Sequence, residues 1–426
     1  MKRKALHFSL ISMLLILLLL VVSVPSLKAD SEKPRLEWSK TYLRFPNYFV
    51  NGAKVGAIDE GYLVIQTIDG GYAISAVKND HHHEPHTGGI DERTNWLIKT
   101  NASGEVEWEK EALTISAFPK SLFQTKDSGY LISGWGEVLK TDANGMAMWN
   151  MTFETWTIAD GKSYYTILSA IETADGGFVF AGRIPDHPYD DAIIMKFDKN
   201  CNLLWNNTLG LDIPIGFEAY QVIEMDNGDI SAIGDGIDAW FSRYDSNGNL
   251  KITVKFNSDD KFVYNQLRFR RMIKVNDEGF VLGGSYQEQG VLAKIDSEGT
   301  MKWNRTFYNP PYENLAGLKP IGVTKDGGYL VEGRGTIVKV YDSGTLLWNV
   351  SYSNLNVGNI NSMAGTKDGG FVAVGQSNSS IMLAKFAPEK TTPSYTSPLS
   401  TAWIAVPLVV TLVAVSVLIY FKRRKQ

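Results

Sequence analysis

A nine-residue phrase recurs seven times along this chain and limits its fold more than any other feature. It consists of a leading residue, a turn acid, a small residue, Gly, an aromatic or apolar residue, three further residues and then often Gly. The copies are IDGGYAISA from Ile68, KDSGYLISG from Lys126, ADGGFVFAG from Ala174, DNGDISAIG from Asp226, NDEGFVLGG from Asn276, KDGGYLVEG from Lys325 and KDGGFVAVG from Lys367. Between Gly71 and Gly370 the repeats are spaced by about 50 residues, a period typical of propellers and solenoids.

A second phrase follows most copies and consists of an apolar strand, a turn with Gly or a similar small residue, and a tryptophan. The tryptophans are Trp108, Trp149, Trp205, Trp303 and Trp348, and the fourth copy has Ile252 at this place. Apolar residues that alternate on both sides of Asp-Gly or Asn-Gly turns predict antiparallel hairpins. With the apolar segment before each DGG turn, every unit has four short strands, as the blade of a β-propeller does.

The two ends of the repeat complement each other. The seventh unit runs out after Met382–Phe386 without a tryptophan strand, whereas a surplus strand of that type, Leu36–Tyr42, stands at the start of the body. We therefore expect an all-β fold: a single seven-bladed β-propeller in which the N-terminal strand closes the last blade. Closure leaves only short sheet edges. An open solenoid is the alternative.

The repeats resemble those of exported archaeal and bacterial surface β-propeller repeat proteins, which carry a T-x-D-G-G-Y/F-x-x-x-G pattern. The resemblance covers residues 36–386. The turn-plus-tryptophan phrase is also distantly similar to the docking motif of quinoprotein-like propellers, although it is at least one residue shorter. The resemblance implies the fold and a surface location, and no activity follows from it, because these families host many.

Residues 1–29 are predicted to be a secretory signal peptide. The chain starts with the basic Met1–Lys4, continues with the apolar Leu10–Val24, and reaches a small residue, Ala29, before a polar stretch. This order of basic, apolar and small residues is typical of a cleaved signal. An uncleaved signal anchor is the alternative.

The C-terminal end is predicted to anchor the chain in a membrane. Residues 387–400 are rich in Pro, Ser and Thr and indicate an extended stalk. Residues 401–421 then form a predicted transmembrane helix, since Ala402–Phe421 is free of charge and would span about 30 Å. A buried core helix is the competing interpretation. The basic tail 422–426 would stay in the cytoplasm, which places the ectodomain, residues 30–386, outside a plasma membrane crossed once.

Composition excludes several classes of function. Between the two basic ends, residues 30–421 carry 34 Lys and Arg against 46 Asp and Glu, a net charge of −12, which disfavours a nucleic-acid partner. The lone cysteine, Cys201, excludes a disulfide framework and a four-cysteine zinc site. At a turn position that is Gly in other units, it indicates drift. No phosphate loop, dinucleotide fingerprint or G-x-S-x-G motif occurs, so no cofactor is predicted.

A histidine-rich loop in the first unit is the one conspicuous metal candidate. It contributes His81, His82, His83 and His86, and the corresponding loop of the third unit contributes His187. Imidazoles beside carboxylates could bind a transition metal such as zinc. Three consecutive histidines cannot all point one way, and no metalloprotease spacing is present. We expect the loop not to be a catalytic metal site.

Other charged residues are weaker candidates. Three arginines near a strand of the fifth unit could pair with an anionic ligand: Arg268, Arg270 and Arg271. Three carboxylates could serve as general acids, although the sequence sets no separation between them: Glu224, Asp235 and Asp238. The segment from Asp245 to Asn249 resembles the start of a calcium loop but lacks the Gly and Glu that such a loop requires, so it predicts an ordinary hairpin turn.

Six N-x-S/T sequons are candidates for glycosylation. They lie at Asn101, Asn150, Asn206, Asn304, Asn349 and Asn378. The middle four directly follow the tryptophan of an outer strand. Because side chains alternate across a strand, an inward tryptophan predicts an outward asparagine. Descent from one ancestral repeat would give the same register without any glycan.

These features favour a membrane-anchored surface module that binds or adheres to an unknown extracellular protein or glycan and is not an enzyme. One alternative is an anchored polysaccharide hydrolase or lyase with its site over the central channel, which predicts converging carboxylates or a metal. Another is a scaffold for envelope proteins, which predicts a large apolar patch. The anchor, the stalk and the lack of a catalytic motif support the first.

Overall fold

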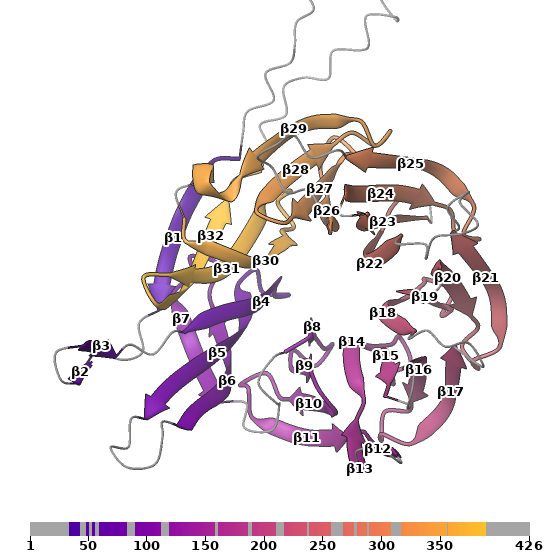
Figure 1. The fold of residues 1–426 in the computed structure, drawn as a ribbon, viewed down its shortest axis with the longest axis horizontal. Helices are drawn as coiled ribbons and strands as arrows, with labels where there is room; N and C mark the ends of the chain where they lie inside the picture. Colours follow the sequence, from indigo (N-terminus) through magenta and orange to yellow (C-terminus); the bar gives the residue numbers. More distant parts are fainter. Residues whose placement is uncertain are drawn as a thin grey trace, which may run out of the picture. The chain divides into compact units, whose positions relative to one another are not determined.

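Seven four-stranded antiparallel sheets stand around a common axis in a computed structural model of the chain (Figure 1). The structure describes residues 34–42, 48–50, 53–55, 59–82, 90–111, 119–157, 161–185, 190–209, 217–236, 238–256, 267–276, 279–287, 289–307, 317–355 and 357–388. This arrangement confirms the predicted all-β, seven-bladed β-propeller.

Each blade contributes one strand to each of four concentric positions. The innermost strands are β4 (Glu60–Gln66), β8 (Ser121–Gln124), β14 (Thr166–Glu172), β18 (Glu218–Glu224), β22 (Arg268–Lys274), β26 (Lys319–Val323) and β30 (Asn359–Gly365). The second strands are β5 (Tyr72–His82), β9 (Tyr130–Ser133), β15 (Phe178–Ile184), β19 (Ile230–Asp235), β23 (Phe280–Tyr286), β27 (Tyr329–Gly333) and β31 (Phe371–Ser377).

The third and outer strands complete the blades, which we number 1 to 7 from β4. The third strands are β6 (Ile90–Thr100), β10 (Glu137–Thr141), β16 (Asp191–Phe197), β20 (Ala239–Tyr244), β24 (Gln289–Ile295), β28 (Thr336–Val340) and β32 (Ser380–Phe386). The outer strands are β7 (Val106–Glu111), β11 (Ala147–Thr152), β17 (Leu203–Leu209), β21 (Leu250–Phe256), β25 (Met301–Phe307), β29 (Leu346–Ser351) and, for blade 7, β1 (Leu36–Tyr42). Outside the blades lie the hairpins β2 (Tyr48–Val50) with β3 (Ala53–Val55) and β12 (Glu154–Thr157) with β13 (Gly161–Tyr164), and the 3-10 helix η1 (Tyr352–Leu355).

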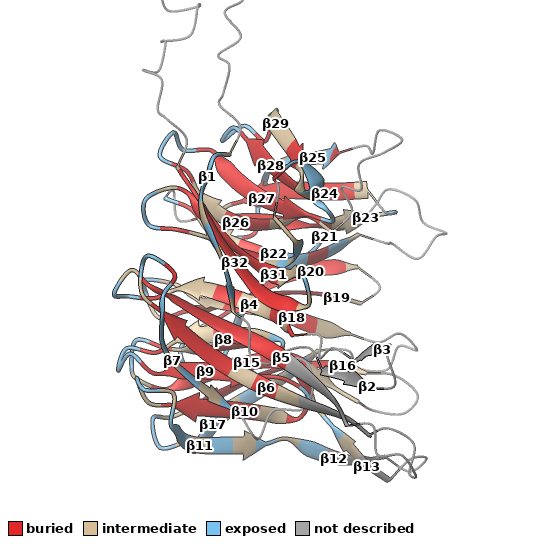
Figure 2. Cartoon of the chain, turned by 90° about the vertical axis from the view of Figure 1, so that its left-hand side faces the viewer, coloured by how far each residue is buried: buried red, intermediate tan, exposed pale blue. Residues whose placement is uncertain are grey.

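Burial explains why the four strand types differ in sequence. The second and third strands are packed between two neighbouring blades, so both of their faces are buried and their sequences are nearly continuous apolar runs (Figure 2). The outer strands alternate instead, as in β17, because one of their faces meets solvent. Hydrophobic clusters therefore form between blades, for example where Val64 and Ile74 of blade 1 meet Val372 and Leu383 of blade 7.

The N-terminal strand closes the ring. β1 pairs antiparallel with β32, so that Leu36 lies opposite Phe386 and Tyr42 opposite Ile381. In Figure 1 the indigo β1 lies beside the yellow β32. The predicted closure by the surplus tryptophan strand is confirmed, and it excludes the open solenoid.

The two ends of the ring differ, and we name them the turn face and the loop face. The turn face carries the first-to-second turn of each blade, Thr67–Gly71 in blade 1, and the third-to-fourth turn, Asn101–Glu105 in blade 1. The loop face carries the second-to-third connections and the links from one blade to the next. The described turns of the turn face lie at the left in Figure 2.

The two glycines of the DGG turn have different tasks. Gly70 has φ +88, a left-handed conformation that most residues avoid. A Cβ on Gly71 would lie 2.1 Å from the carbonyl oxygen of Thr100, so the second glycine lets two strands approach closely. The recurring turn is thus explained by backbone geometry.

The recurring tryptophan docks one blade on the next. The Trp38 ring packs edge-on to Tyr72, with ring centroids 5.8 Å apart, and fills the space where a Cβ on Gly104 would meet it at 2.6 Å. Equivalent ring pairs are Trp108–Tyr130, Trp149–Phe178 and Trp303–Tyr329. In blade 4 the second strand starts with Ile230, and Trp205 stacks on Tyr244 at the end of the third strand. In blade 4, which lacks the tryptophan, Val254 approaches Gly299 instead.

The predicted membrane segments remain predictions. No helix in the described part of the chain is long and apolar enough to cross a membrane. The signal peptide, most of the stalk, the predicted transmembrane helix and the basic tail lie outside the described residues.

Candidate functional site

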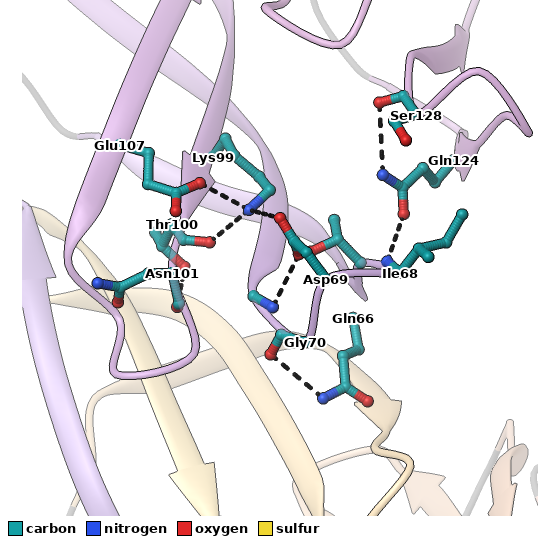
Figure 3. A network of polar contacts seen from close by, with 12 residues as sticks. Gln66, Ile68, Asp69, Gly70, Lys99, Thr100, Asn101, Glu107, Gln124 and Ser128 are labelled. Atoms are coloured by element: carbon teal, nitrogen blue, oxygen red, sulfur yellow. Dashed lines mark hydrogen bonds and ion pairs between the residues drawn. The ribbon is translucent and has the colours of Figure 1, made fainter.

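The described aspartates of the repeated turns lie around the ring, and each of them is held in an internal contact. In blade 1, Asp69 accepts hydrogen bonds from the Thr67 hydroxyl at 2.5 Å and from the Gly71 amide at 3.0 Å. The buried Lys99 of β6 lies 2.8 Å from the same carboxylate (Figure 3). We call this arrangement of turn carboxylate and third-strand cation the lock.

The lock recurs around the ring with two variations. The cation–carboxylate pairs are Lys99–Asp69, Lys140–Asp127, Lys196–Asp175, Arg243–Asp229, Lys294–Asp342, Lys339–Asp326 and Lys385–Asp368. In blade 4 the carboxylate comes from the second glycine position. In blade 5, whose turn aspartate lies outside the described residues, Lys294 contacts Asp342 in a turn of blade 6. These aspartates stabilise the fold and are unsuited to acid–base chemistry on a ligand.

The locks predict a loss of stability in acid. Burial by itself would raise the pKa of Asp69, but hydrogen bonds from Lys99, Thr67 and the Gly71 amide lower it from 3.8 to about 2. Asp175 is lowered to about 2 in the same way. Because the folded-state pKa lies below the unfolded value, this stabilisation is complete above 3.8 and is lost as the pH falls toward 2. We expect the melting temperature to fall steeply in this window, and a melting temperature that stays constant down to about pH 2 would contradict it.

A second set of polar side chains joins neighbouring blades at the turn face. Gln124 Oε1 accepts the Ile68 amide of the preceding blade at 2.7 Å, and Gln66 accepts the Lys367 amide across the closure at 2.7 Å. Glu224 Oε2 takes the same role with the Ala174 amide, also at 2.7 Å. The structure therefore places Glu224, a candidate general acid in the sequence, in a contact between blades.

A third set joins the innermost strands near the axis. Ser121 accepts the Ala170 amide at 3.3 Å, Ser169 accepts the Val222 amide at 3.3 Å, and Gln221 accepts the Met272 amide at 2.7 Å. The equivalent residue of blade 5 is Arg271, which has no acceptor atom. Blade 5 therefore breaks this pattern and brings a cation to the axis.

A further group of polar residues gathers where blades 4 and 5 meet, at the loop-face end of their inner strands. Tyr220 Oη of β18 donates to Asp235 Oδ2 at the end of β19, 3.2 Å away. Arg268 Nε of β22 lies 3.4 Å from the same oxygen. The Arg270 guanidinium lies over the Tyr220 ring, 5.4 Å from its centroid. We call these four residues the arginine cluster.

Asp235 is the titratable centre of the arginine cluster. Burial raises its pKa from 3.8 to about 6; Arg268 and the hydrogen bond from Tyr220 oppose this shift, and Glu218 adds to it. Burial also raises the pKa of Tyr220, with Asp235 contributing. Glu218 lies directly opposite Asp235 in the strand register and is also paired with Arg183 of blade 3 at 3.3 Å.

Arg271 faces the opposite neighbour, blade 6. The residue is exposed. Desolvation by the surrounding protein nevertheless lowers the pKa of its guanidinium, and the Glu332 carboxylate opposes this shift. Glu332 is buried, lies 3.1 Å from Lys319 Nζ, and accepts the Met363 amide at 3.2 Å. Glu332 thus replaces in blade 6 the acceptor that Ser121 provides in blade 2.

The structure does not describe the side chains of the histidine candidates. His81 and His82 end β5, but their side chains are not described, and His83, His86 and His187 lie outside the described residues. Within the described residues no group of three or more His, Cys, Asp or Glu side chains could hold a metal ion. The histidine-loop prediction therefore stays a prediction.

Three further residues that the sequence singled out lie in turns or directly before a strand. Asp245 holds the β20–β21 turn by accepting the Asn247 and Asn249 amides, each at 2.9 Å, as expected of an ordinary hairpin turn. Cys201 has φ +65 where other blades have a left-handed Gly. Asp238 directly precedes β20, close in sequence to the arginine cluster.

The sequons lie on the outer strands and turns. Asn150, Asn206 and Asn304 are exposed, as the alternation with tryptophan predicts, and Asn349 is half-buried. Asn101 holds the β6–β7 turn through its side-chain oxygen, and Asn378 is exposed in the β31–β32 turn. Glycosylation itself stays a prediction.

The sequence alone missed Tyr220, Glu218 and Glu332. A signal for Glu332 was present, since it stands in KDGGYLVEG at a position that holds Ser133 in blade 2 and Ala181 in blade 3. An acid in place of a small buried residue indicates a local task. No comparable signal marks Tyr220, whose partners come from other strands.

The structure is a seven-bladed β-propeller with an arginine cluster at the loop-face end of the inner strands of blades 4 and 5. No protein-family model and no curated protein matches the chain. Among solved structures it is similar to a protein of unknown function from Bacteroides caccae, with 13% identity over 57% of this chain and 79% of that chain and a TM-score of 0.42. It is also similar to Sqt1 from Chaetomium thermophilum, with 10% identity over 75% of this chain and 80% of that chain and a TM-score of 0.48. Similarities this low carry no argument about function.

Proposed function

We propose that this chain is a membrane-anchored surface module that binds an extracellular ligand at the loop face of its propeller and is not an enzyme. The observation that carries the proposal is that the repeated polar residues are paired inside the protein, whereas the unrepeated arginines are exposed. The repeated carboxylates and lysines are engaged in locks at the turn face, whereas the unrepeated Arg268 and Arg270 are exposed at the other end of their strand. The resemblance to exported surface propellers supports the location.

Both ends of the propeller lie at the turn face. β1 starts and β32 finishes at the turn face, where the Ala387 amide donates to the Arg35 carbonyl oxygen at 2.8 Å. A stalk that continues from Ala387 leaves the propeller at this face. The loop face carries neither end of the propeller and so remains available to a ligand.

The two alternative functions have less support. A scaffold predicts one large apolar patch, but the exposed apolar side chains at the start of the outer strands, such as Val106, Leu203 and Leu250, are distributed among different blades. A hydrolase or lyase is favoured by one observation, the raised pKa of Asp235. However, the neighbouring carboxylate, Glu218, is paired with Arg183. The other partners of Asp235 are a tyrosine with a raised pKa and an arginine, and neither is suited to be the base.

The location can be tested with the single native cysteine removed. In a Cys201→Ala chain, Ser246→Cys places a thiol on an exposed turn of the propeller, and Gln426→Cys places one at the end of the basic tail. A membrane-impermeant maleimide added to intact cells should label Ser246→Cys, and Gln426→Cys only after permeabilisation. Labelling of the tail in intact cells, or protection of the propeller, would overturn the proposal.

A further inference from the structure

The cations of β22 are unusually concentrated for this chain. Arg268, Arg270 and Arg271 occupy three of four consecutive positions on one innermost strand, and all three are exposed. The strand register shifts between Phe269 and Arg271, so Arg270 is the extra residue of a β-bulge. The bulge lets Arg268 and Arg270 both contact blade 4 while Arg271 faces blade 6.

The contacts of Arg268 and Arg270 within the protein do not fully neutralise their positive charges. The ion pair of Arg268 with Asp235, at 3.4 Å, is longer than the 2.8 Å of the Lys99–Asp69 lock. Among the described residues, Arg270 has a ring contact with Tyr220 and no ion pair. Planar guanidinium groups that remain exposed are well suited to binding carboxylate, sulfate or phosphate oxygens.

Neighbouring blades extend the site along the loop face. One position near the loop-face end of the second strand holds Trp135 in blade 2, Arg183 in blade 3 and Asp235 in blade 4. Trp135 is 56% exposed, and the nearby Tyr164 is 46% exposed. Arg183 is already paired with Asp190 and Glu218, so these blades extend the site with the amphipathic rings of Trp135 and Tyr164, which suit the apolar faces of an extended ligand.

We propose that Arg268 and Arg270, which lie beside Asp235 and Tyr220, bind the acidic groups of an anionic polysaccharide at the loop face. The inference rests on the proposed function, because it requires a loop face open to extracellular ligands. An acidic peptide offers the same charges without sugar rings, and the test separates it.

Asp235 makes this binding sensitive to pH. It competes with the ligand for Arg268, and Glu218, Tyr220 and Arg270 are the other charged or titratable groups that surround it. Since burial raises its pKa to about 6, the carboxyl becomes neutral as the pH falls below that value. Arg268 is then released from its internal partner, and anion binding should tighten in mild acid.

The test uses the full chain in nanodiscs and measures binding by biolayer interferometry. The probes are polygalacturonate and dextran sulfate, which distinguish carboxylate from sulfate as the acidic group, with neutral dextran and poly-glutamate for comparison. We expect either anionic polysaccharide to bind, binding to weaken with salt, and neutral dextran not to bind. Equal binding of poly-glutamate, or no binding of either polysaccharide by correctly oriented protein, would overturn the ligand class while leaving the proposed location intact.

Variants test the residues. Arg268→Gln with Arg270→Gln should weaken binding about tenfold or more, because two charge-assisted contacts are lost. The matched control is Arg305→Gln, an exposed arginine on the outer strand of the same blade, which should leave affinity unchanged. Asp235→Asn should bind dextran sulfate more tightly at about pH 7.5 and remove the change between about pH 7.5 and pH 5. Equal losses in the double variant and in the control, or a pH response that persists in Asp235→Asn, would contradict the assignment.

Discussion

Deletion of residues 30–45 is expected to open the ring, lower the melting temperature by on the order of 10 °C and cause self-association. The deletion removes β1, which pairs with β32 over the length of the strand. It also removes Trp38 from its contact with Tyr72, and loss of a packed tryptophan costs about 3–5 kcal/mol. The exposed edge of β32 can then pair with another chain. Thermal unfolding and size-exclusion chromatography with light scattering measure both effects.

Two smaller changes provide the comparison. A deletion limited to residues 30–33 keeps β1 and should behave like the parent chain. Lys40 also lies on β1, and Lys40→Ala removes its exposed ion pair with Glu105 of the β6–β7 turn. This change should alter the unfolding free energy by less than about 1 kcal/mol. If the longer deletion remained monomeric and equally stable, β1 would not be the closing strand.

Asp326→Asn is expected to destabilise the protein by about 2–3 kcal/mol. It removes the carboxylate that lies 2.7 Å from Lys339 Nζ, and the lysine side chain is completely buried. Breaking a buried pair is costly because the remaining charge loses its counter-charge in a site that water cannot reach. Since Asp326 itself is 41% exposed, solvent reduces the loss below the value for a fully enclosed pair.

Chemical denaturation of matched variants isolates the effect of burial. Lys302→Met breaks a pair with Asp296 in which the lysine is 51% exposed, and it should cost less than about 1 kcal/mol. The double variant Lys339→Met with Asp326→Asn should be more stable than Asp326→Asn alone, because no buried charge remains. Equal losses for the buried and the exposed pair would show that the locks have no special role.

The repeats made most of the fold predictable. Each DGG turn and tryptophan acts within one blade or on the next, so its spacing alone predicts hairpins of similar length. Closure could be predicted because the surplus strand around Trp38 has the same pattern as the strand around Trp348. The structure adds the reason for the pattern, namely the tight approach at Gly71 and the buried lysine that recurs on the third strands.

The candidate site was much less predictable, because its contacts join different strands and blades. Glu224 and Asp235 are equivalent as carboxylates in the sequence, yet one accepts a turn amide and the other lies beside Arg268. The difference arises from their ends of the blade: Glu224 ends β18 at the turn face, whereas Asp235 ends β19 at the loop face. The arginines were identified as possible anion ligands, but Tyr220, which lies against both Asp235 and Arg270, was not.

Hydrogen–deuterium exchange of the full chain in nanodiscs, with and without dextran sulfate, tests most directly the claim that repeated residues maintain the ring and that ligand binds where the repeat is broken. Peptides that cover β18 and β22 should gain protection from exchange, because these strands carry Tyr220 and the arginines. Peptides that cover the turn-face locks, such as Thr67–Gly71, should be unchanged. Protection confined to the turn face, with β18 and β22 unaffected, would contradict the account.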